Sequence, residues 1–438
     1  MVRGQLFVVR GPRQTAFLGI DLICQYLATC TVRKVNARIM RCSILRDSWR
    51  NQPVAIGGQQ DTSEDGPAPA KKGELDYLTV KGFRSIKSIE KLELRPINVL
   101  VGANGSGKSN FLEVFAFLRF LRQGHLVDYT DRAGGAEKIL HFGSKVTKEI
   151  EIEISFRDGT DSYHVALSPT ADDRFYVHDE WCWYWVKPQY PQPYSVGLTG
   201  SGKEAGISEP QERVAGWVRR RLDSWRYYHF HDTSSTSAMR KTADVDDNRF
   251  LRADASNLAA YLYLLQQAHQ PEYQLIRKTV QRVAPFFDDF HLEPLRSNPN
   301  KVKLEWIHKS SDAYFDASSL SDGTLRFICL STLFLQPLAF RPSAIIVDEP
   351  ELGLHPYAIT MLASLVQAAA TETQVILSTQ SAWLLDHFQP EDVLVADLEQ
   401  GATTLKRLQS QDLAVWLEEY SLGQLWEKNQ FGGRPTRG

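Results

Sequence analysis

The eight residues "GANGSGKS" (102–109) constrain the fold of this 438-residue chain more than any other stretch. They follow the apolar segment "INVLV" and precede "SNFLEVFAFLRFLRQ" (109–123), in which apolar residues recur at helical spacing. A glycine-rich turn with G-x-x-x-x-G-K-S spacing, placed between a strand and a helix, has the context of a phosphate-binding P-loop. The chain is therefore predicted to have an α/β fold in which this loop follows a central strand.

The residue types in this loop match the chemistry of a nucleoside triphosphate. Glycines let backbone N–H groups wrap the phosphates, the helix N-terminus adds its positive dipole end, and a lysine reaches the β and γ phosphates. The hydroxyl of Ser109 is a Mg²⁺ ligand in this motif. We predict that ATP and Mg²⁺ bind here, with the nucleotide contacted by Gly102, Ala103, Asn104, Gly105, Ser106, Gly107, Lys108, Ser109 and Asn110.

A second G-x-x-x-x-G-K stretch, "GLTGSGKE" (197–204), lacks this context. Glu204 stands where a metal-binding hydroxyl belongs, and its carboxylate would repel phosphate. The preceding "PQYPQPYS" is interrupted by proline and is not typical of a central strand. We predict a surface loop.

Two adjacent carboxylates end a second apolar strand, in "SAIIVDEPELGLHP". The strand covers 344–347, and Asp348 and Glu349 follow it in the hhhhDE pattern of a Walker B strand. Asp348 is predicted to hold the Mg²⁺ shell, and Glu349 to orient or deprotonate the attacking water as a catalytic residue beside Lys108. Such a pair is often only a solvated turn, but the P-loop in the same chain favours catalysis.

Between these motifs lies "ASSLSDGTLRF", in which 320–324 resembles the signature of ABC-type ATPases. Ser321, Asp322 and Gly323 would then face, at a helix N-terminus, a nucleotide bound by another subunit. In isolation the tetrapeptide Ser-Asp-Gly-Thr (321–324) indicates an ordinary helix cap. Its position 27 residues before Asp348 favours the signature, because one helix and a short turn fill that interval.

Five stretches in order resemble the RecF-type predicted ATPases, relatives of the structural-maintenance-of-chromosomes and overcoming-lysogenization-defect proteins. They are "FRSIKS", the phosphate loop, "LSDGTLR", "IIVDEPELGLHP" and "STQSAWLLD", within about 75–430. The resemblance implies an ABC-type head, with a mixed sheet, flanking helices and an antiparallel β-subdomain, interrupted by a helical and β insertion. It also implies a homodimer that sandwiches two MgATP.

The resemblance bears on three further positions. Gln380 ends the strand in "QVILSTQSAW", where many relatives carry a histidine that senses the γ-phosphate; we expect a catalytic glutamine that donates a hydrogen bond but carries no charge. Arg84 matches a basic position near the nucleotide. A linking glutamine expected after the first helix has no clear counterpart: Gln123 is too close to the loop, His141 lies at a plausible distance, and the position stays unassigned.

Composition divides the chain into four parts. Residues 75–155 and 319–438 form the two halves of the ATPase head, and 156–318 is an insertion of strands followed by helices. The basic 1–74 carries nine Arg or Lys in its first fifty residues and ends in the Gly/Pro-rich linker "GGQQDTSEDGPAPAKKGE". A start codon assigned too far upstream is the favoured interpretation, with disorder, a transit peptide or a basic partner-binding arm as alternatives.

The insertion contains two candidates for nucleic-acid contact. Trp181, Trp183 and Trp185 share one face of a strand and could stack on bases, but packing against a helix is the favoured interpretation. The arginines at 219–221 could bind phosphate, although most such runs are solvated faces. A net charge of -2 gives no further support for DNA binding.

The remaining composition limits the possible settings. Five scattered cysteines without CxxC spacing fit a reducing cytosol and predict no thiol-bound metal. No apolar run approaches the ~18 residues of a membrane span, so we expect a cytoplasmic protein. The segment after Gln380 is too short for a fused nuclease domain, so any nuclease would be a separate polypeptide.

The motifs predict an ATP-hydrolysing conformational switch. The resemblance to RecF-type ATPases implies a role in DNA repair or maintenance, or in phage defence, with a separately encoded effector and possibly DNA as partners. An ATP-gated scaffold that restrains a toxic partner with little hydrolysis is the alternative. A transporter ATPase subunit is less favoured, because 213 residues separate Lys108 from Ser321.

Overall fold

The computed structural model describes residues 75–198, 200, 202–209 and 213–433. They belong to one compact unit, 70–438. The interpretations of 1–74 lie outside the described residues.

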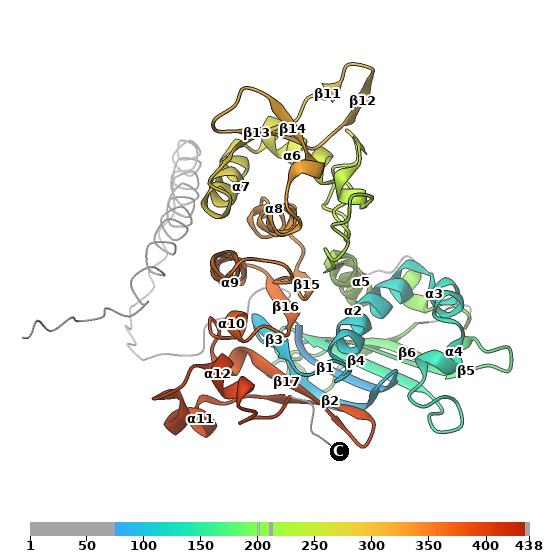
Figure 1. The fold of residues 1–438 in the computed structure, drawn as a ribbon. Helices are drawn as coiled ribbons and strands as arrows, with labels where there is room; N and C mark the ends of the chain where they lie inside the picture. Colours follow the sequence, from blue (N-terminus) through green and yellow to red (C-terminus); the bar gives the residue numbers. More distant parts are fainter. Residues whose placement is uncertain (1–74, 199, 201, 210–212, 434–438) are drawn as a thin grey trace, which may run out of the picture. The chain divides into compact units, whose positions relative to one another are not determined.

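A six-stranded mixed sheet forms the centre of this unit (Figure 1). Its order is β18-β17-β3-β16-β15-β8, and all strands are parallel except β18, which pairs antiparallel with β17. Every residue of β15 and β16 is buried, as expected for apolar strands covered on both faces. Because parallel strands end at the same edge, the loops after β3, β15 and β16 meet there. The bounds are β3 Ile97–Val101, β8 Trp225–Tyr228, β15 Ala344–Asp348, β16 Gln374–Thr379, β17 Val393–Glu399 and β18 Ala402–Arg407.

A second sheet of six strands is antiparallel, with the order β2-β1-β4-β5-β6-β7. In β4, Ile150, Ile152 and Ile154 are buried and face the core, whereas Glu151 and Glu153 between them are partly exposed. The predicted antiparallel subdomain is confirmed. The bounds are β1 Leu75–Phe83, β2 Ile86–Glu93, β4 Ile150–Phe156, β5 Asp161–Pro169, β6 Phe175–Tyr184 and β7 Tyr194–Gly197.

Two helices connect the sheets. Helix α2 (Lys108–Gln123) packs against β8, β15 and β16, and α5 (Arg213–Ser224) packs against α2, β5 and β6. Trp225 joins the layers, because its ring lies 5.5 Å from that of Phe115 on α2 and 6.1 Å from that of Phe156 on β4. One hydrophobic core therefore supports both sheets. The short helices α3 (Leu126–Ala133) and α4 (Ala136–Ile139) follow α2.

Helices α8 (Asp322–Leu335) and α9 (Pro356–Ala369) pack against each other. Helix α8 packs on α7 and α9, and α9 packs on β16. Ser321 caps α8, and every side chain from Leu325 to Leu335 is buried. The other helices are α6 Leu258–Ala268, α7 Gln270–Val283, α10 Ala382–Leu385, α11 Ser410–Leu417 and α12 Leu422–Glu427. Two three-stranded sheets, β10-β13-β14 and β11-β12-β9, complete this region; their bounds are β9 Ala243–Asp244, β10 Phe287–His291, β11 Pro294–Leu295, β12 Asn298–Val302, β13 Glu305–His308 and β14 Tyr314–Asp316.

The range treated as an insertion, 156–318, contributes to both main sheets. Strands β5 to β7 extend the antiparallel sheet, and β8 is the edge strand of the central sheet, beside β15. Sequence analysis did not predict that 156–318 supplies an edge strand of the central sheet. Among the described residues, no helix combines the length and apolarity needed to cross a membrane.

The expected packing of the tryptophan face against a helix is wrong. Helix α5 packs against β6, where Glu180 and Cys182 are buried, whereas Trp181 is 41% exposed. Trp183 and Trp185 line an open cleft of about 560 Å³ with Lys91 and other residues. The cause is that strand alternation assigns residues to two faces without indicating which face a helix will cover.

The arginines at 219–221 have three different environments. The guanidinium of Arg221 lies 4.8 Å from the centre of the Trp217 ring, and Arg219 donates a hydrogen bond to the Ser208 carbonyl oxygen. Arg220 is exposed. Two of the three therefore take part in the packing of α5, and a phosphate-binding role for the run stays a prediction.

Candidate active site

The phosphate loop joins β3 to α2 through two glycines in the left-handed region. Gly105 has φ 81° and Gly107 has φ 95°, conformations that other residues rarely adopt. A Cβ at Gly107 would also fall inside 3.0 Å of the Thr403 side chain. The backbone can therefore wrap a ligand only because these positions carry no side chain.

Lys108 lies against this loop and is almost fully buried. Its Nζ donates hydrogen bonds to the carbonyl oxygens of Gly102, at 2.8 Å, and Ala103, at 2.9 Å. Burial lowers the pKa of Lys108, and the carboxylates of Glu349 and Asp348 oppose that shift. Ser106 Oγ is buried without a hydrogen-bond partner among the described residues, as expected for a polar atom that serves a ligand.

The residues predicted to hold Mg²⁺ are brought together from distant parts of the chain. Ser109 Oγ lies 3.2 Å from Asp348 Oδ2, and Ser378 Oγ bonds the other oxygen of the same carboxylate. Hydroxyl and carboxylate oxygens are the donors that Mg²⁺ prefers. These residues fit the ion.

Glu349 follows β15 in a left-handed conformation, with φ 43°, which is uncommon for a residue with a side chain. Its N–H lies 3.2 Å from both Ser378 O and Ser378 Oγ, and Gln380 Nε2 donates to Glu349 Oε1. Such local strain is often found at functional sites. Two residues at the end of β16 thus hold the predicted base, and Gln380 reaches that base directly.

Sequence analysis missed Glu351, which fastens the same two loops together. Its Oε1 accepts hydrogen bonds from Thr379 Oγ1, at 2.6 Å, and from the Gln380 N–H, at 3.1 Å. Burial raises the pKa of Glu351, and its Oε2 has no hydrogen-bond partner among the described residues. Glu351 lies in the loop after β15, two residues beyond Glu349, and nothing in the sequence apart from its carboxyl group indicated this role.

Two further residues reach Asp348 from β8 and the segment that follows it. The Tyr227 hydroxyl lies 3.4 Å from Asp348 Oδ2, and His231 Nε2 donates to the Asp348 carbonyl oxygen at 3.0 Å. Burial, and next the charge of Asp348, raises the pKa of Tyr227. The four residues of β8 show no alternating pattern of burial, so no periodic signal in the sequence indicated this strand.

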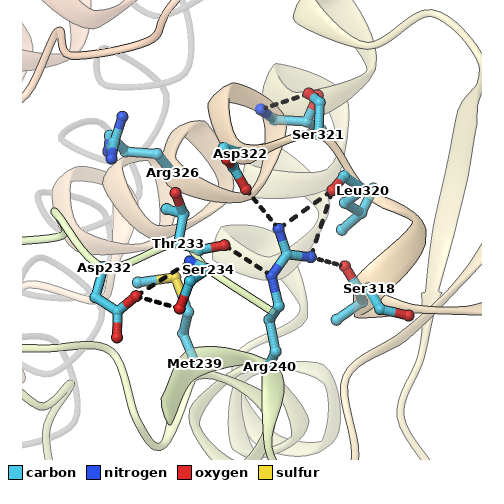
Figure 2. Close-up of polar contacts among 12 residues, drawn as sticks. Asp232, Thr233, Ser234, Met239, Arg240, Ser318, Leu320, Ser321, Asp322 and Arg326 are labelled. Atoms are coloured by element: carbon cyan, nitrogen blue, oxygen red, sulfur yellow. Dashed lines mark hydrogen bonds and ion pairs between the residues drawn. The ribbon is translucent and has the colours of Figure 1, made fainter. Parts of the chain in front are cut away.

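The signature residues begin α8 (Figure 2). Ser321 Oγ accepts the Thr324 N–H at 3.2 Å, and Asp322 pairs with Arg240 at 2.8 Å. A Cβ at Gly323 would fall inside 3.0 Å of the Gly353 carbonyl oxygen, so this position lets α8 approach the loop after β15. No hydrogen bond or ion pair of the described residues joins 321–323 to the phosphate loop of the same chain.

A family described as "AAA domain, putative AbiEii toxin, Type IV TA system" matches residues 97–386. This stretch is well over half of the chain and contains the phosphate loop, the signature and the Walker B strand. The chain belongs to this family.

The curated relatives of this AAA-family chain are RecF proteins. The DNA replication and repair protein RecF of Lacticaseibacillus casei is 27% identical over 95 residues, 22% of this chain and 24% of that protein. The same protein of Lactobacillus acidophilus is 33% identical over 92 residues, 18% of this chain and 23% of that protein. The chain thus spans about a quarter of the length of the relatives it matches.

A solved structure shows the fold. The crystal structure of the SmcHead bound to the C-winged helix domain of ScpA has a TM-score of 0.54 and 16% identity to this chain. The superposition covers 78% of this chain and 99% of the chain in that structure. With the family match and the RecF relatives, this likeness confirms an ABC-type ATPase head of the RecF and SMC kind.

Arg84 and Asn110, both predicted to contact the nucleotide, bond other residues of the same chain. Arg84, at φ 49°, pairs with Glu113 of α2 at 2.5 Å, and Asn110 Nδ2 donates to Ser85 Oγ at 2.6 Å. A ring nitrogen of His141 bonds the Arg84 carbonyl oxygen at 2.8 Å. The roles of Arg84 and Asn110 in nucleotide binding stay predictions.

The second glycine-rich stretch has a different task. The Glu204 carboxylate accepts the N–H groups of Leu126, at 2.8 Å, and Val127, at 3.1 Å, at the start of α3. A carboxylate at a helix N-terminus stabilises that helix. Glu204 therefore acts as a structural cap for α3.

Proposed function

We propose that this chain binds MgATP, hydrolyses it, and uses the cycle as a conformational switch. The observation that carries the proposal is the convergence of Ser109, Asp348, Glu349 and Gln380 at one edge of the central sheet. They come from the ends of β15 and β16 and from the first turn of α2. Metal-binding oxygens, a carboxylate base and a phosphate-binding loop together are the parts that phosphoryl transfer to water requires.

Each of these residues has a separate role in the proposed reaction. Lys108 exchanges its two carbonyl partners for phosphate oxygens, which form stronger, charge-assisted hydrogen bonds. Ser109 and Asp348 would hold Mg²⁺, which would supply positive charge to offset that of the phosphates. Glu349 accepts the proton of the attacking water as the new P–O bond forms and the bond to ADP breaks. Gln380 orients the Glu349 carboxylate through its amide.

We further propose that a second copy of the chain completes each site. Ser321, Asp322 and Gly323 begin α8, where the first N–H groups point out of the helix end and favour an anion. Two copies arranged with two-fold symmetry would each present this end to the nucleotide of the other. ATP binding would close the homodimer, and hydrolysis would reopen it.

The proposed output is mechanical and acts on a separately encoded effector in DNA maintenance or phage defence. The names of similar proteins support this proposal. The description of the matching family includes the words "putative AbiEii toxin, Type IV TA system", and the curated relatives are named DNA replication and repair proteins.

The substitution Glu349→Gln tests the enzyme proposal. Loss of the base is expected to lower phosphate release by about 10²-fold or more, the usual contribution of general base catalysis. ATP-dependent dimerisation, measured by light scattering, should persist because the amide keeps the size of the side chain. Glu419→Gln, at an exposed glutamate on the surface, is the matched control.

If Glu349→Gln dimerises with ATP and releases phosphate at the wild-type rate, the hydrolysis proposal fails. The ATP-gated scaffold that restrains a partner would then be the better interpretation.

A further inference from the structure

One segment, 229–240, connects the backbone of the predicted metal-binding residue Asp348 to the signature turn of the same chain. We call this segment "HFHDTSSTSAMR" the strap. Near its start, His231 donates to the Asp348 carbonyl oxygen at 3.0 Å. At its end, Arg240 reaches the turn before α8 (Figure 2).

Arg240 is a buried cation whose donors are all used. Its side chain is 6% exposed. Nε donates to Thr233 O at 3.0 Å, and Nη2 donates to Leu320 O at 3.3 Å and to Asp322 Oδ1 at 2.8 Å. Nη1 donates to Ala317 O and to Leu320 O. A guanidinium has five N–H donors, and a buried one is tolerated only where acceptors surround it.

These bonds hold the two residues on either side of Ser321, Leu320 by its backbone and Asp322 by its side chain. The carbonyl of Leu320 and the carboxylate of Asp322 are held by one rigid, planar group. Ser321 itself is left out of this network, and its Oγ accepts the Thr324 N–H instead. In Figure 2, Ser321 points away from Arg240. Arg240 therefore helps to fix the position and orientation of the N-terminus of α8, and it does not itself cover the N–H groups of that terminus.

A second buried guanidinium joins the strap to the body of α8. Arg326 Nε donates to Phe230 O at 2.8 Å, and Nη2 donates to His231 O at 3.1 Å. Its Nη1 bonds Leu352 O in the loop after β15. Two guanidiniums thus tie the strap to α8, and Arg240 is the one next to the signature.

We propose that Arg240 is a positioning residue that acts in trans: it sets the signature turn of its own subunit for the nucleotide bound by the second copy. This inference rests on the proposed two-subunit site. Arg240 would thus serve the nucleotide site of the second copy. The strap that carries Arg240 also contacts Asp348, which belongs to the nucleotide site of its own subunit.

Mixed dimers separate an effect in trans from an effect in cis. Arg240→Ala alone is expected to lower phosphate release about tenfold to hundredfold, the scale for misplacing a group by a fraction of an ångström to 1 Å. When it is mixed with an equal amount of Glu349→Gln, each mixed dimer has one site with an intact Glu349 and an intact signature turn. With random pairing about half of the dimers are mixed and each has one intact site of two, so release should recover to about a quarter of the wild-type rate.

Two control mixtures make the result unambiguous. Ser321→Arg mixed with Glu349→Gln should recover in the same way if the site is shared between subunits. His231→Ala, which removes the bond to Asp348, should not recover with Glu349→Gln, because it disrupts the Walker site of the subunit that must supply it. Recovery of the Ser321 control without recovery of the Arg240 mixture would overturn the inference. Failure of the Ser321 control would instead overturn the two-subunit site, and the inference with it.

Further variants keep the test decisive if Arg240→Ala does not fold. Arg240→Lys keeps the charge but loses the fork that bonds three acceptors, and Asp322→Asn removes the ion pair while leaving the carbonyl bonds. Each should lower the rate at least about threefold and recover when mixed with Glu349→Gln. An Arg240 variant that hydrolyses ATP alone at the wild-type rate contradicts the inference.

Discussion

Gly323→Ala places a methyl group where the signature helix meets the loop after β15. A Cβ there would fall inside 3.0 Å of the Gly353 carbonyl oxygen, a distance that real Cβ atoms essentially never show. Gly353 itself has φ 73°, so its carbonyl is held in a conformation that few other residues adopt. The start of α8 must therefore move, by roughly half an ångström, because the loop has little freedom to yield.

Two opposing effects decide the stability of this variant. Alanine in a helix is favoured over glycine by about 0.5–1 kcal/mol, whereas an overpacked contact costs about 1–3 kcal/mol. The net loss of about 0–2.5 kcal/mol leaves the protein folded, with a melting temperature lowered by several degrees. The effect on catalysis should be larger, since a shift of this size in a phosphate-binding group lowers the rate roughly tenfold.

The assay compares phosphate release at saturating ATP with the affinity of the subunit for a fluorescent ATP analogue. We expect the first to fall and the second to stay unchanged, because the phosphate loop of the same chain makes no hydrogen bond to Gly323. Gly197→Ala is the control, since no heavy atom of the described residues lies within 4 Å of that added Cβ. A Gly323→Ala protein with the wild-type rate would refute the reasoning.

The remaining predictions concern the loops at the ends of β15 and β16. Burial raises the pKa of Glu351, so the folded state binds this proton more tightly than the unfolded state, and stability is lost as pH rises from below the unfolded value of ~4.3. Glu351→Gln should show a smaller loss of melting temperature between about pH 4 and pH 7 than the wild type, and an identical pH dependence would contradict this. Gln380→His should give faster and more pH-dependent phosphate release than the wild type between about pH 6 and pH 8, a range that spans the usual histidine pKa of ~6.5; equal rates would exclude a role for Gln380 in sensing phosphate.

The elements with continuous apolar patterns could be predicted from the sequence. The helix 109–123 is predicted within one residue of α2, the apolar segment before the phosphate loop is β3, and the apolar strand before Asp348 is β15. In the P-loop and Walker B motifs the functional residues follow an apolar strand at a fixed distance along the chain. Their positions at the end of that strand could therefore be predicted from neighbouring residues alone.

Strand β8 could not be predicted in this way. It has only four residues, and Trp225 and Tyr228 are buried while Arg226 and Tyr227 are not. Its place beside β15 depends on a pairing across 119 residues, such as Ala344 with Trp225, which local periodicity does not encode. For this reason Tyr227 and His231 were missed as neighbours of Asp348. The same limit explains the error at the tryptophan face of β6.

Thr403 gives the phosphate loop a dependence on the order in which the chain is made. Its Oγ1 donates to the Ser106 carbonyl oxygen at 3.0 Å and contacts Ser85 Oγ at 2.7 Å, and β18, which carries it, pairs only with β17 in the central sheet. A ribosome that has released residues 102–109 must therefore add nearly three hundred more before the wall of the loop is present. Until then a nascent chain contains the P-loop sequence without the contacts from Thr403. Tight ATP binding should therefore appear only after the hairpin of β17 and β18 has been synthesised.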